Sequence, residues 1–192
     1  TAFVWAYALT NPGLNSLRTP IFAEMVNIIK GQEVAFTDYK FDTTQFKNIF
    51  NNYKFLNGRP LTKSMITWWA YNSEEQELMS LETIIEIEHI YAKNRFEKEH
   101  SLTSKELVES LGNKAILEKR INIRASDYRF EDKKKYYNGY ETPRGPKAGT
   151  KIRELTNLAA SNTDFKESDI EARYNSILNS FVDYLKSNEL IK

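Results

Sequence analysis

Three stretches in the first third of the chain have the spacing of amphipathic helices. The first, "RTPIFAEMVNIIKG", predicts a helix capped by Thr19, with Pro20 in its first turn and Gly31 at its end. The second and third are "DTTQFKNIFNNYKFLNG" and "LTKSMITWWAYN". Their aromatic residues recur at helical intervals, which indicates packing between helices rather than a cofactor or base-stacking site.

The hydrophobic period changes to two after residue 80. Residues 83–90 alternate as a strand does, with Ile87 and His89 on one face and Glu86 and Glu88 on the other. Residues 114–121 predict a second strand. A strand pair of this size is too small to be stable alone, so we expect helices to pack on it.

The segments around these strands predict further helices and one loop. "TSKELVESLGN" has a Thr103/Glu106 capping box, and "ASDYRFEDKKKYY" has Ser126 or Asp127 as its cap. "NGYETPRGPKAGT" predicts a mobile loop rich in Gly and Pro. Two helices, over residues 151–160 and 168–188, close the chain.

The predicted fold is therefore α+β and mostly helical, with a small antiparallel strand pair and the helix after it embedded in a helical domain. We expect residues 1–80 to form a helical scaffold and residues 81–192 to form the functional domain, the two making one compact unit. The opening "TAFVWAYAL" has the pattern of the inside of an apolar helix. We therefore expect the chain to be a fragment of a longer protein.

Composition removes several classes of function. The 192 residues include no Cys, which excludes disulfides, thiolate zinc sites and cysteine nucleophiles. This composition is compatible with a reducing, cytoplasmic location, and no apolar run approaches the length of a membrane span. The glycines of "RGPKAG" lack the spacing of a phosphate-binding loop.

Charge is distributed unevenly, although the formal net charge is +1. Residues 114–153 hold twelve basic and five acidic side chains, whereas the segments on either side are each net acidic. The middle segment is a local positive field. Such a field suits a nucleic-acid partner, but a solvated charged face would look the same.

Residues that suit phosphodiester chemistry gather around the predicted strand pair. Glu88 and His89 end the first strand, Asn113 precedes the second, and Asn122 follows it. A neutral imidazole near pH 7 can accept the proton of a water that attacks phosphorus. A carboxylate and an amide carbonyl can hold Mg²⁺ or Mn²⁺, which stabilises charge on the phosphate oxygens. Taken singly, Asn113 could merely end a helix and Asn122 could merely cap one.

The stretches "IEIEHI", "LGNKAILEKRIN" and "SDYRFEDKK" resemble the HNH, or His-Me finger (ββα-metal), nucleases. They are most similar to the HNH domain at the C-terminus of GmrSD-type modification-dependent restriction and phage-defence enzymes. "DIEARYNSIL" resembles the closing helix of that domain, with Ile170 and Arg173 at the recurring spacing. Two positions depart from the pattern: Ala92 stands where many HNH sequences have proline, and Glu88 stands where Asp is common.

The resemblance implies a metal-dependent DNA endonuclease of a restriction or anti-phage defence protein. It implies His89 as the general base, Asn113 as the brace of the loop that carries His89, and Asn122 and Glu88 as ligands of a Mg²⁺ or Mn²⁺ ion. Lys133 would contact phosphate or support the site. The implied partners are DNA, with modified phage DNA as one candidate, and an N-terminal ParB-like NTP-sensing domain of the same protein that lies outside this chain.

Basic residues near the predicted site are expected to bind the nucleic-acid backbone. They are Lys93, Arg95, Lys119, Arg120, Arg124, Arg129, Lys133 and Lys134. His100, the second histidine, is expected to be solvated. Two other functions stay open: a catalytically inactive nucleic-acid-binding or regulatory module, which would bind DNA without metal or cleavage, and a helical protein-interaction domain without DNA affinity.

Overall fold

The computed structural model describes residues 18–34 and 42–188, with side chains described from residue 21 onward. The predicted helix in "TAFVWAYAL" lies outside the described residues. Contacts divide the chain into two compact units: Thr1–Tyr53 with Ser176–Lys192, and Lys54–Asn175. The predicted division at residue 80 differs from this, because the helix over Pro60–Tyr71 packs on the strand pair and falls in the second unit.

The first unit holds helices α2 (Arg18–Ile29) and α3 (Thr43–Asn52) and the C-terminal part of α9 (Glu167–Ser187). The carboxylate of Asp42 caps α3 by accepting from the backbone N–H of Gln45 at 2.9 Å. Phe46 and Phe50 are buried and lie against Phe181, with ring centroids 5.8 and 6.4 Å away. The aromatic residues of this region therefore pack between helices, as their spacing predicted.

The second unit is the larger one and contains all of the predicted site residues. Along the chain it runs α4 (Pro60–Tyr71), β1 (Ile85–His89), α5 (Lys93–Glu99), the 3₁₀ turns η3 (Lys105–Glu109) and η4 (Leu111–Asn113), β2 (Lys114–Glu118), α6 (Lys119–Ala125), α7 (Phe130–Asn138), β3 (Gly139–Tyr140), β4 (Lys147–Ala148), α8 (Arg153–Ser161) and the start of α9. The predicted α+β, mostly helical fold is confirmed.

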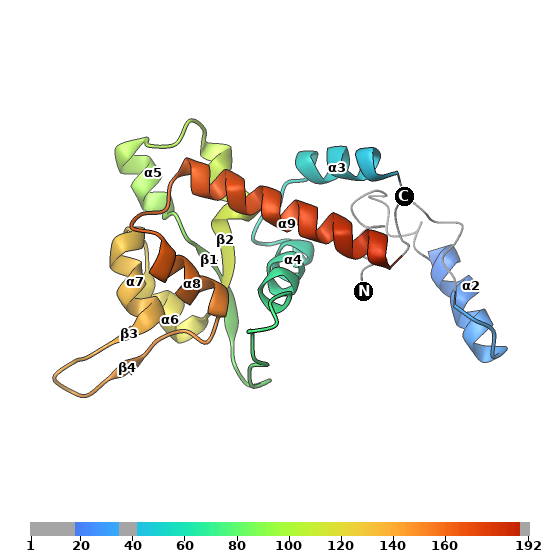
Figure 1. Cartoon of the computed structure of the whole chain (residues 1–192), viewed down its shortest axis with the longest axis horizontal. Coiled ribbons are helices and arrows are strands. Elements are labelled where there is room, and N and C mark those ends of the chain that lie inside the picture. Colours follow the sequence, from blue (N-terminus) through green and yellow to red (C-terminus); the bar gives the residue numbers. More distant parts are fainter. Residues whose placement is uncertain (1–17, 35–41, 189–192) are drawn as a thin grey trace. The chain divides into compact units, whose positions relative to one another are not determined.

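The strand pair β1–β2 is antiparallel, with a register from Ile85↔Glu118 to His89↔Lys114. It lies between α4 on one side and α6, α7 and α8 on the other (Figure 1). Residues 114–117 of β2 are all buried, because helices cover both faces of the pair. This agrees with the expectation that so small a sheet requires helices to be stable.

Several predicted boundaries were wrong. The second strand ends at Glu118 rather than at residue 121. Glu118 stands at the N-cap position of α6 without a cap hydrogen bond, and its carboxylate accepts instead from Thr150 Oγ1 at 2.5 Å and from the Lys151 N–H at 2.7 Å. The helix predicted to begin at Ser126 or Asp127 begins at Phe130. Ser126 instead ends α6 with a positive φ of 43°.

Two further local predictions differ from the structure. The Thr103/Glu106 capping box does not form, because the N–H and hydroxyl of Thr103 both bond to the carboxylate of Glu167, at 2.7 and 2.6 Å. The segment after it is a 3₁₀ turn. The Gly/Pro loop after α7 contains the short β3–β4 pair, in which Gly139 has a φ of 84°. Nowhere in the described ranges is a helix long and apolar enough to cross a membrane.

Candidate active site

His89 is the last residue of β1, and its side chain shares a face of the strand pair with Lys114. The register places these two residues directly opposite each other, and opposite residues share a face. Glu109 of η3 reaches the same place, with its Oε2 3.6 Å from Nε2 of His89. The His89 side chain is 12% exposed, and within the described structure its Nε2 is buried without a hydrogen-bond partner. One imidazole nitrogen therefore faces a carboxylate without bonding to it.

Glu109 is the centre of a charged cluster on this face. Lys114 Nζ donates to its Oε2 at 2.8 Å, and Lys93 pairs with its Oε1. Burial raises the pKa of Glu109, but the hydrogen bonds from Lys114 and Lys93 outweigh burial and hold that pKa at about 2. Burial lowers the pKa of His89 to about 4, which the charge of Glu109 offsets in part. At neutral pH the imidazole is uncharged and the carboxylate is ionised.

Asn113 ties the segment that follows His89 to the turn that leads into β2. Its side chain accepts from the Tyr91 N–H at 2.7 Å and donates to the Tyr91 carbonyl at 3.0 Å and the Val108 carbonyl at 2.9 Å. The Ile90 N–H also bonds to the Asn113 carbonyl, at 3.0 Å. Asn113 is fully buried. These are the contacts that a brace requires, because they hold both backbone groups of Tyr91, two positions after His89.

The turn that carries Asn113 is itself fixed by α9. The guanidinium of Arg173 donates to the carbonyls of Leu111, Gly112 and Lys114 at 3.1, 2.9 and 2.7 Å. Its other nitrogens bond to the two carboxylate oxygens of Glu154, at 2.6 and 2.9 Å. A Cβ at Gly112 would lie 2.0 Å from the Ile170 carbonyl oxygen, so only glycine allows α9 to approach this closely.

Glu88 lies on the opposite face of β1 and is almost completely buried. Its Oε1 accepts from Lys133 Nζ and from the Tyr137 hydroxyl, both at 2.7 Å. Lys133 also donates to the His89 carbonyl at 2.6 Å. Burial raises the pKa of Glu88, and the charge of Lys133 opposes that rise. Both hydrogen bonds use Oε1, which leaves Oε2 as the oxygen that could bind a cation.

Asn122 lies on α6 and forms a hydrogen bond with β1 on the face that carries Glu86 and Glu88. Its amide Nδ2 donates to Glu86 Oε2 at 3.0 Å. Since alternate residues of a strand share a face, Glu86 and Glu88 lie opposite to His89. No hydrogen bond within the described residues joins Asn122 to His89. The imidazole and the amide have different neighbours, and their action on one phosphate remains a prediction.

The donors on the Glu88 face suit a hard cation. The carboxylates of Glu86 and Glu88 and the carbonyl oxygen of Asn122, whose Nδ2 is directed to Glu86, are all oxygen donors. Mg²⁺ is commonly held by one or two carboxylates and keeps several waters. No group of three or more His, Asp or Glu side chains in the described part of the chain could enclose a metal ion. The donor types fit Mg²⁺ or Mn²⁺, with much of the coordination left to water and phosphate.

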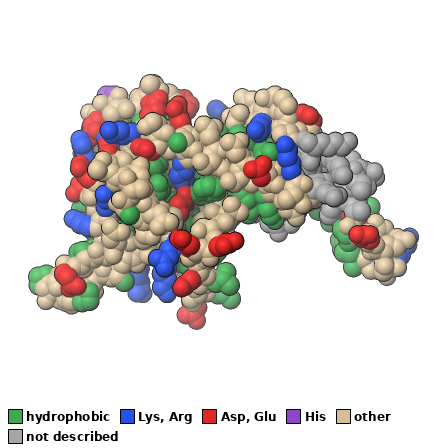
Figure 2. Space-filling view, in the orientation of Figure 1, with side chains coloured by type: hydrophobic (Ala, Val, Ile, Leu, Met, Phe, Trp, Pro, Cys, Tyr) green, Lys and Arg blue, Asp and Glu red, His purple; other side chains and the backbone are tan. Residues whose placement is uncertain are grey.

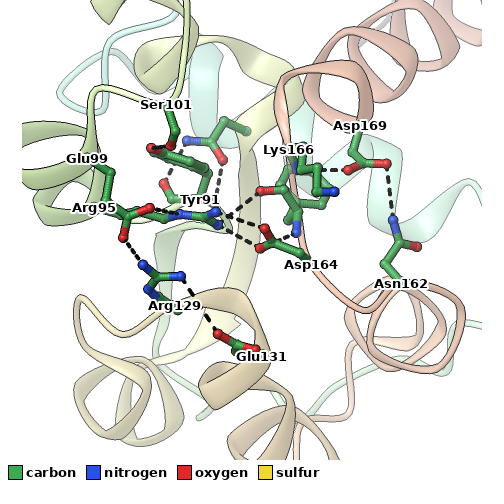
Figure 3. A network of polar contacts seen from close by, with 12 residues as sticks. Tyr91, Arg95, Glu99, Ser101, Arg129, Glu131, Asn162, Asp164, Lys166 and Asp169 are labelled. Atoms are coloured by element: carbon green, nitrogen blue, oxygen red, sulfur yellow. Dashed lines mark hydrogen bonds and ion pairs between the residues drawn. The ribbon is translucent and has the colours of Figure 1, made fainter.

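Three of the basic residues predicted to bind DNA form ion pairs with acidic residues of the same domain. The guanidinium of Arg95 forms two hydrogen bonds with Asp164, at 2.6 and 2.8 Å, and a third with Glu99 at 3.0 Å (Figure 3). Arg129 pairs with Glu99 in the same network. The Lys133 side chain is 1% exposed and binds Glu88. Of the two roles predicted for Lys133, support of the site matches this position better than contact with phosphate.

The other predicted DNA-binding residues have partly or fully exposed side chains. Lys119 and Arg120 begin α6, and Lys119 is 3.6 Å from Glu86. Arg124 donates to the Ala148 carbonyl of β4 at 3.2 Å, and Lys134 donates to the Asn162 carbonyl at 2.8 Å. Lys93 is exposed beside Glu109. Figure 2 shows Lys and Arg side chains (blue) gathered around α6 and the start of the β3–β4 pair.

Glu109, Lys114 and Tyr137 contact the predicted site residues but were not predicted. Glu109 and Tyr137 come from segments whose positions relative to β1 are decided by tertiary packing. Lys114 could have been found from sequence, because pairing the two predicted strands outward from Asn113 places it opposite His89.

Comparison with known families identifies the family of the chain. The family model described as "GmrSD restriction endonucleases, C-terminal domain" matches residues 40–180, which is most of the chain. No curated protein and no solved structure gives a significant match. The chain belongs to the family of C-terminal domains of GmrSD restriction endonucleases. This membership indicates a nuclease domain of a restriction enzyme family, with DNA as its class of substrate.

Proposed function

We propose that this domain is a metal-dependent DNA endonuclease of the HNH type, with His89 as the general base. The observation that supports this most is the brace of Asn113, which holds both backbone groups of Tyr91 directly after the strand end that carries His89. Helix α6, with Asn122, follows β2 without an intervening residue. Strand, braced turn, strand and helix occur in the order that the HNH resemblance implies.

The surroundings of His89 suit proton transfer from water. Because its pKa is about 4, the imidazole is neutral at pH 7 and has a lone pair that can accept a proton. Nε2 faces Glu109, so Nδ1 would take the proton. The Glu109 carboxylate, 3.6 Å from Nε2, would stabilise the imidazolium that forms. In this proposal Glu109 is a positioning residue for His89.

Glu88 and Asn122 would hold a Mg²⁺ or Mn²⁺ ion, and Glu86 would orient the Asn122 amide. Such an ion, when bound, stabilises the negative charge that develops on the phosphate oxygens. Lys133 would keep Glu88 and the end of β1 in place, because its ammonium binds both the Glu88 carboxylate and the His89 carbonyl. The DNA backbone would be bound by the exposed basic residues around α6, and a ParB-like NTP-sensing domain would precede this one.

The chain has two histidines, which allows a matched test. Purified protein with Mg²⁺ or Mn²⁺ is expected to nick supercoiled plasmid DNA, and EDTA is expected to stop nicking. His89→Asn should lower nicking at least 100-fold, since general-base catalysis contributes about that much or more. His100→Asn should leave nicking unchanged, because His100 is exposed and has a φ of 47° that Asn tolerates.

Folding is checked on the same samples by circular dichroism and thermal unfolding. Equal nicking by the wild type and His89→Asn would exclude His89 as the base, and nicking that persists in EDTA would exclude the metal. Salt-dependent DNA binding without any nicking would instead favour the inactive nucleic-acid-binding module.

A further inference from the structure

Three tyrosines from consecutive elements form a connected group on the second unit, here called the tyrosine stack. Tyr128 lies in the loop between α6 and α7, Tyr136 in α7 and Tyr140 in β3. The rings of Tyr128 and Tyr136 are nearly parallel, with an interplanar angle of 11° and centroids 5.9 Å apart. Tyr140 meets Tyr136 edge-on, at 5.4 Å and 89°. These contacts connect the loop, the helix and the hairpin.

Two cations lie over the rings of this stack. Lys135 Nζ is 5.0 Å from the ring centroid of Tyr136, and Arg124 Cζ is 6.0 Å from that of Tyr140. Arg124 is held in place by the carbonyls of Arg120 and Ala148, each at 3.2 Å. Both distances are within the range of cation–π attraction. Positive charge is therefore fixed beside aromatic rings, in the segment of the chain that is most basic.

Tyr128 ends the stack and remains open to solvent. Tyr136 covers one side of its ring, yet 50% of Tyr128 is exposed, which makes it one of the exposed large side chains of the domain. A tyrosine that served only to hold the loop would be stabilised by further burial. A ring that stacks on another tyrosine and is still half exposed is suited to stack with a further flat group.

We propose that Tyr128 stacks with an unpaired base of the DNA substrate, while Arg124 and Lys135 bind the phosphates next to that base. The inference rests on the proposed function for its class of ligand and adds a preference for DNA in which a base lies outside the helix. Every base has an aromatic face, so this contact selects the unpaired state rather than a sequence. The cations supply the sequence-independent part of the affinity.

The test compares a labelled duplex containing one bulged adenine with the same duplex without the bulge. Affinities are measured by fluorescence anisotropy in EDTA, so that no cleavage occurs. The wild type should prefer the bulged duplex roughly tenfold, the range expected for one base–aromatic stack. Tyr128→Ala should abolish the preference and Tyr128→Phe should retain it. Phe22→Ala is the matched control, because Phe22 is also an exposed aromatic residue, at 56%, and lies in α2.

The charged residues have a different expected signature. Arg124→Gln and Lys135→Gln should weaken binding of both duplexes alike and reduce the salt dependence of binding. A wild type with no preference for the bulge, a preference that survives Tyr128→Ala, or an absence of DNA binding would each overturn the proposal. Plasmid nicking by the wild type and His89→Asn is measured separately with metal. Nicking without a bulge preference would overturn the stacking proposal and leave the nuclease assignment intact.

Discussion

On each face of the β1–β2 pair a glutamate binds a buried lysine, but the two ion pairs are in different settings. On the His89 face, Glu109 is 32% exposed and binds Lys114 and Lys93. On the opposite face, Glu88 is 4% exposed and binds Lys133. The pKa of Glu109 is lowered to about 2, whereas that of Glu88 is raised.

Burial raises the pKa of both carboxyl groups, and the sign of the net shift depends on whether the bound lysines outweigh that burial. Glu109 keeps part of its hydration and has two ammonium partners, which together outweigh the effect of burial on its pKa. A carboxylate enclosed in protein loses hydration that one ammonium does not replace in full. The Glu88 pair is therefore costly to form and highly sensitive to the loss of either partner, whereas the Glu109 pair can reorganise around water and Lys93.

Removing the lysine of the enclosed pair is expected to have the largest effect. Lys133→Met removes the ammonium that binds the buried Glu88 carboxylate and the His89 carbonyl. Glu88 keeps the Tyr137 hydroxyl but loses its ion pair, so the free energy of unfolding should fall by about 3–5 kcal/mol. Urea denaturation followed by circular dichroism measures this loss. Lys134→Met, one residue further on and partly exposed, is the control and should change stability by less than about 1 kcal/mol.

Replacing the buried lysine on the His89 face by methionine tests whether the two ion pairs differ. Lys114→Met should cost about 1–2 kcal/mol, because Glu109 keeps Lys93 and solvent although the Phe55 carbonyl loses its donor. Equal losses for Lys133→Met and Lys114→Met would show that the two pairs are equivalent and would contradict the role given to burial.

Lowering the pH should reduce the stability of the fold through His89. Its pKa is about 4 when folded and 6.5 when unfolded, so the unfolded chain binds more protons between these values. Stability from the neutral imidazole is therefore full above pH 6.5 and is lost as the pH falls toward 4, by on the order of 2 kcal/mol after allowance for partial exposure. Urea midpoints of the wild type and His89→Asn, measured from pH 7 to pH 4, should converge. Parallel curves would show that His89 does not titrate in this way.

Removing the charge of Glu109 beside His89 should have the smallest effect of these changes, and it should appear in the rate of DNA nicking. Glu109→Gln removes the charge that would stabilise the imidazolium and should lower kcat for DNA nicking about tenfold, with KM nearly unchanged. Glu109→Asp, which keeps the charge, should recover part of the rate. An unchanged kcat for Glu109→Gln would separate Glu109 from the chemistry and leave it a structural residue.

The sequence was most informative where one periodic pattern decided the structure. The alternation of residues 83–90 predicted that Glu88 and His89 point to opposite faces, and their contacts with α7 and η3 agree. The closing helix, predicted over residues 168–188, runs over Glu167–Ser187. In both cases the side chains of one element face one environment on each side, so local spacing contains the information.

Predictions failed where distant residues decide the outcome. The second strand ends at Glu118 because Thr150 and Lys151, more than thirty residues further on, bind its carboxylate. Thr103 prefers Glu167 to a local cap for the same reason. The neighbours of Glu88 and His89 come from α7 and η3, whose positions depend on how the helices pack. The motif predicted which residues matter, but not which partners set their charge.

The anchoring of Asn113 also limits how the chain can vary in length. If one residue were inserted between Gly112 and Lys114, β2 would slip by a single position against β1, and every side chain of the strand would change sides. The inserted residue would then stand where the buried ammonium now meets Glu109, and Lys114 would move to the position of Ala115, opposite Glu88. Natural insertions should therefore be tolerated in the β3–β4 loop and be absent from this three-residue turn.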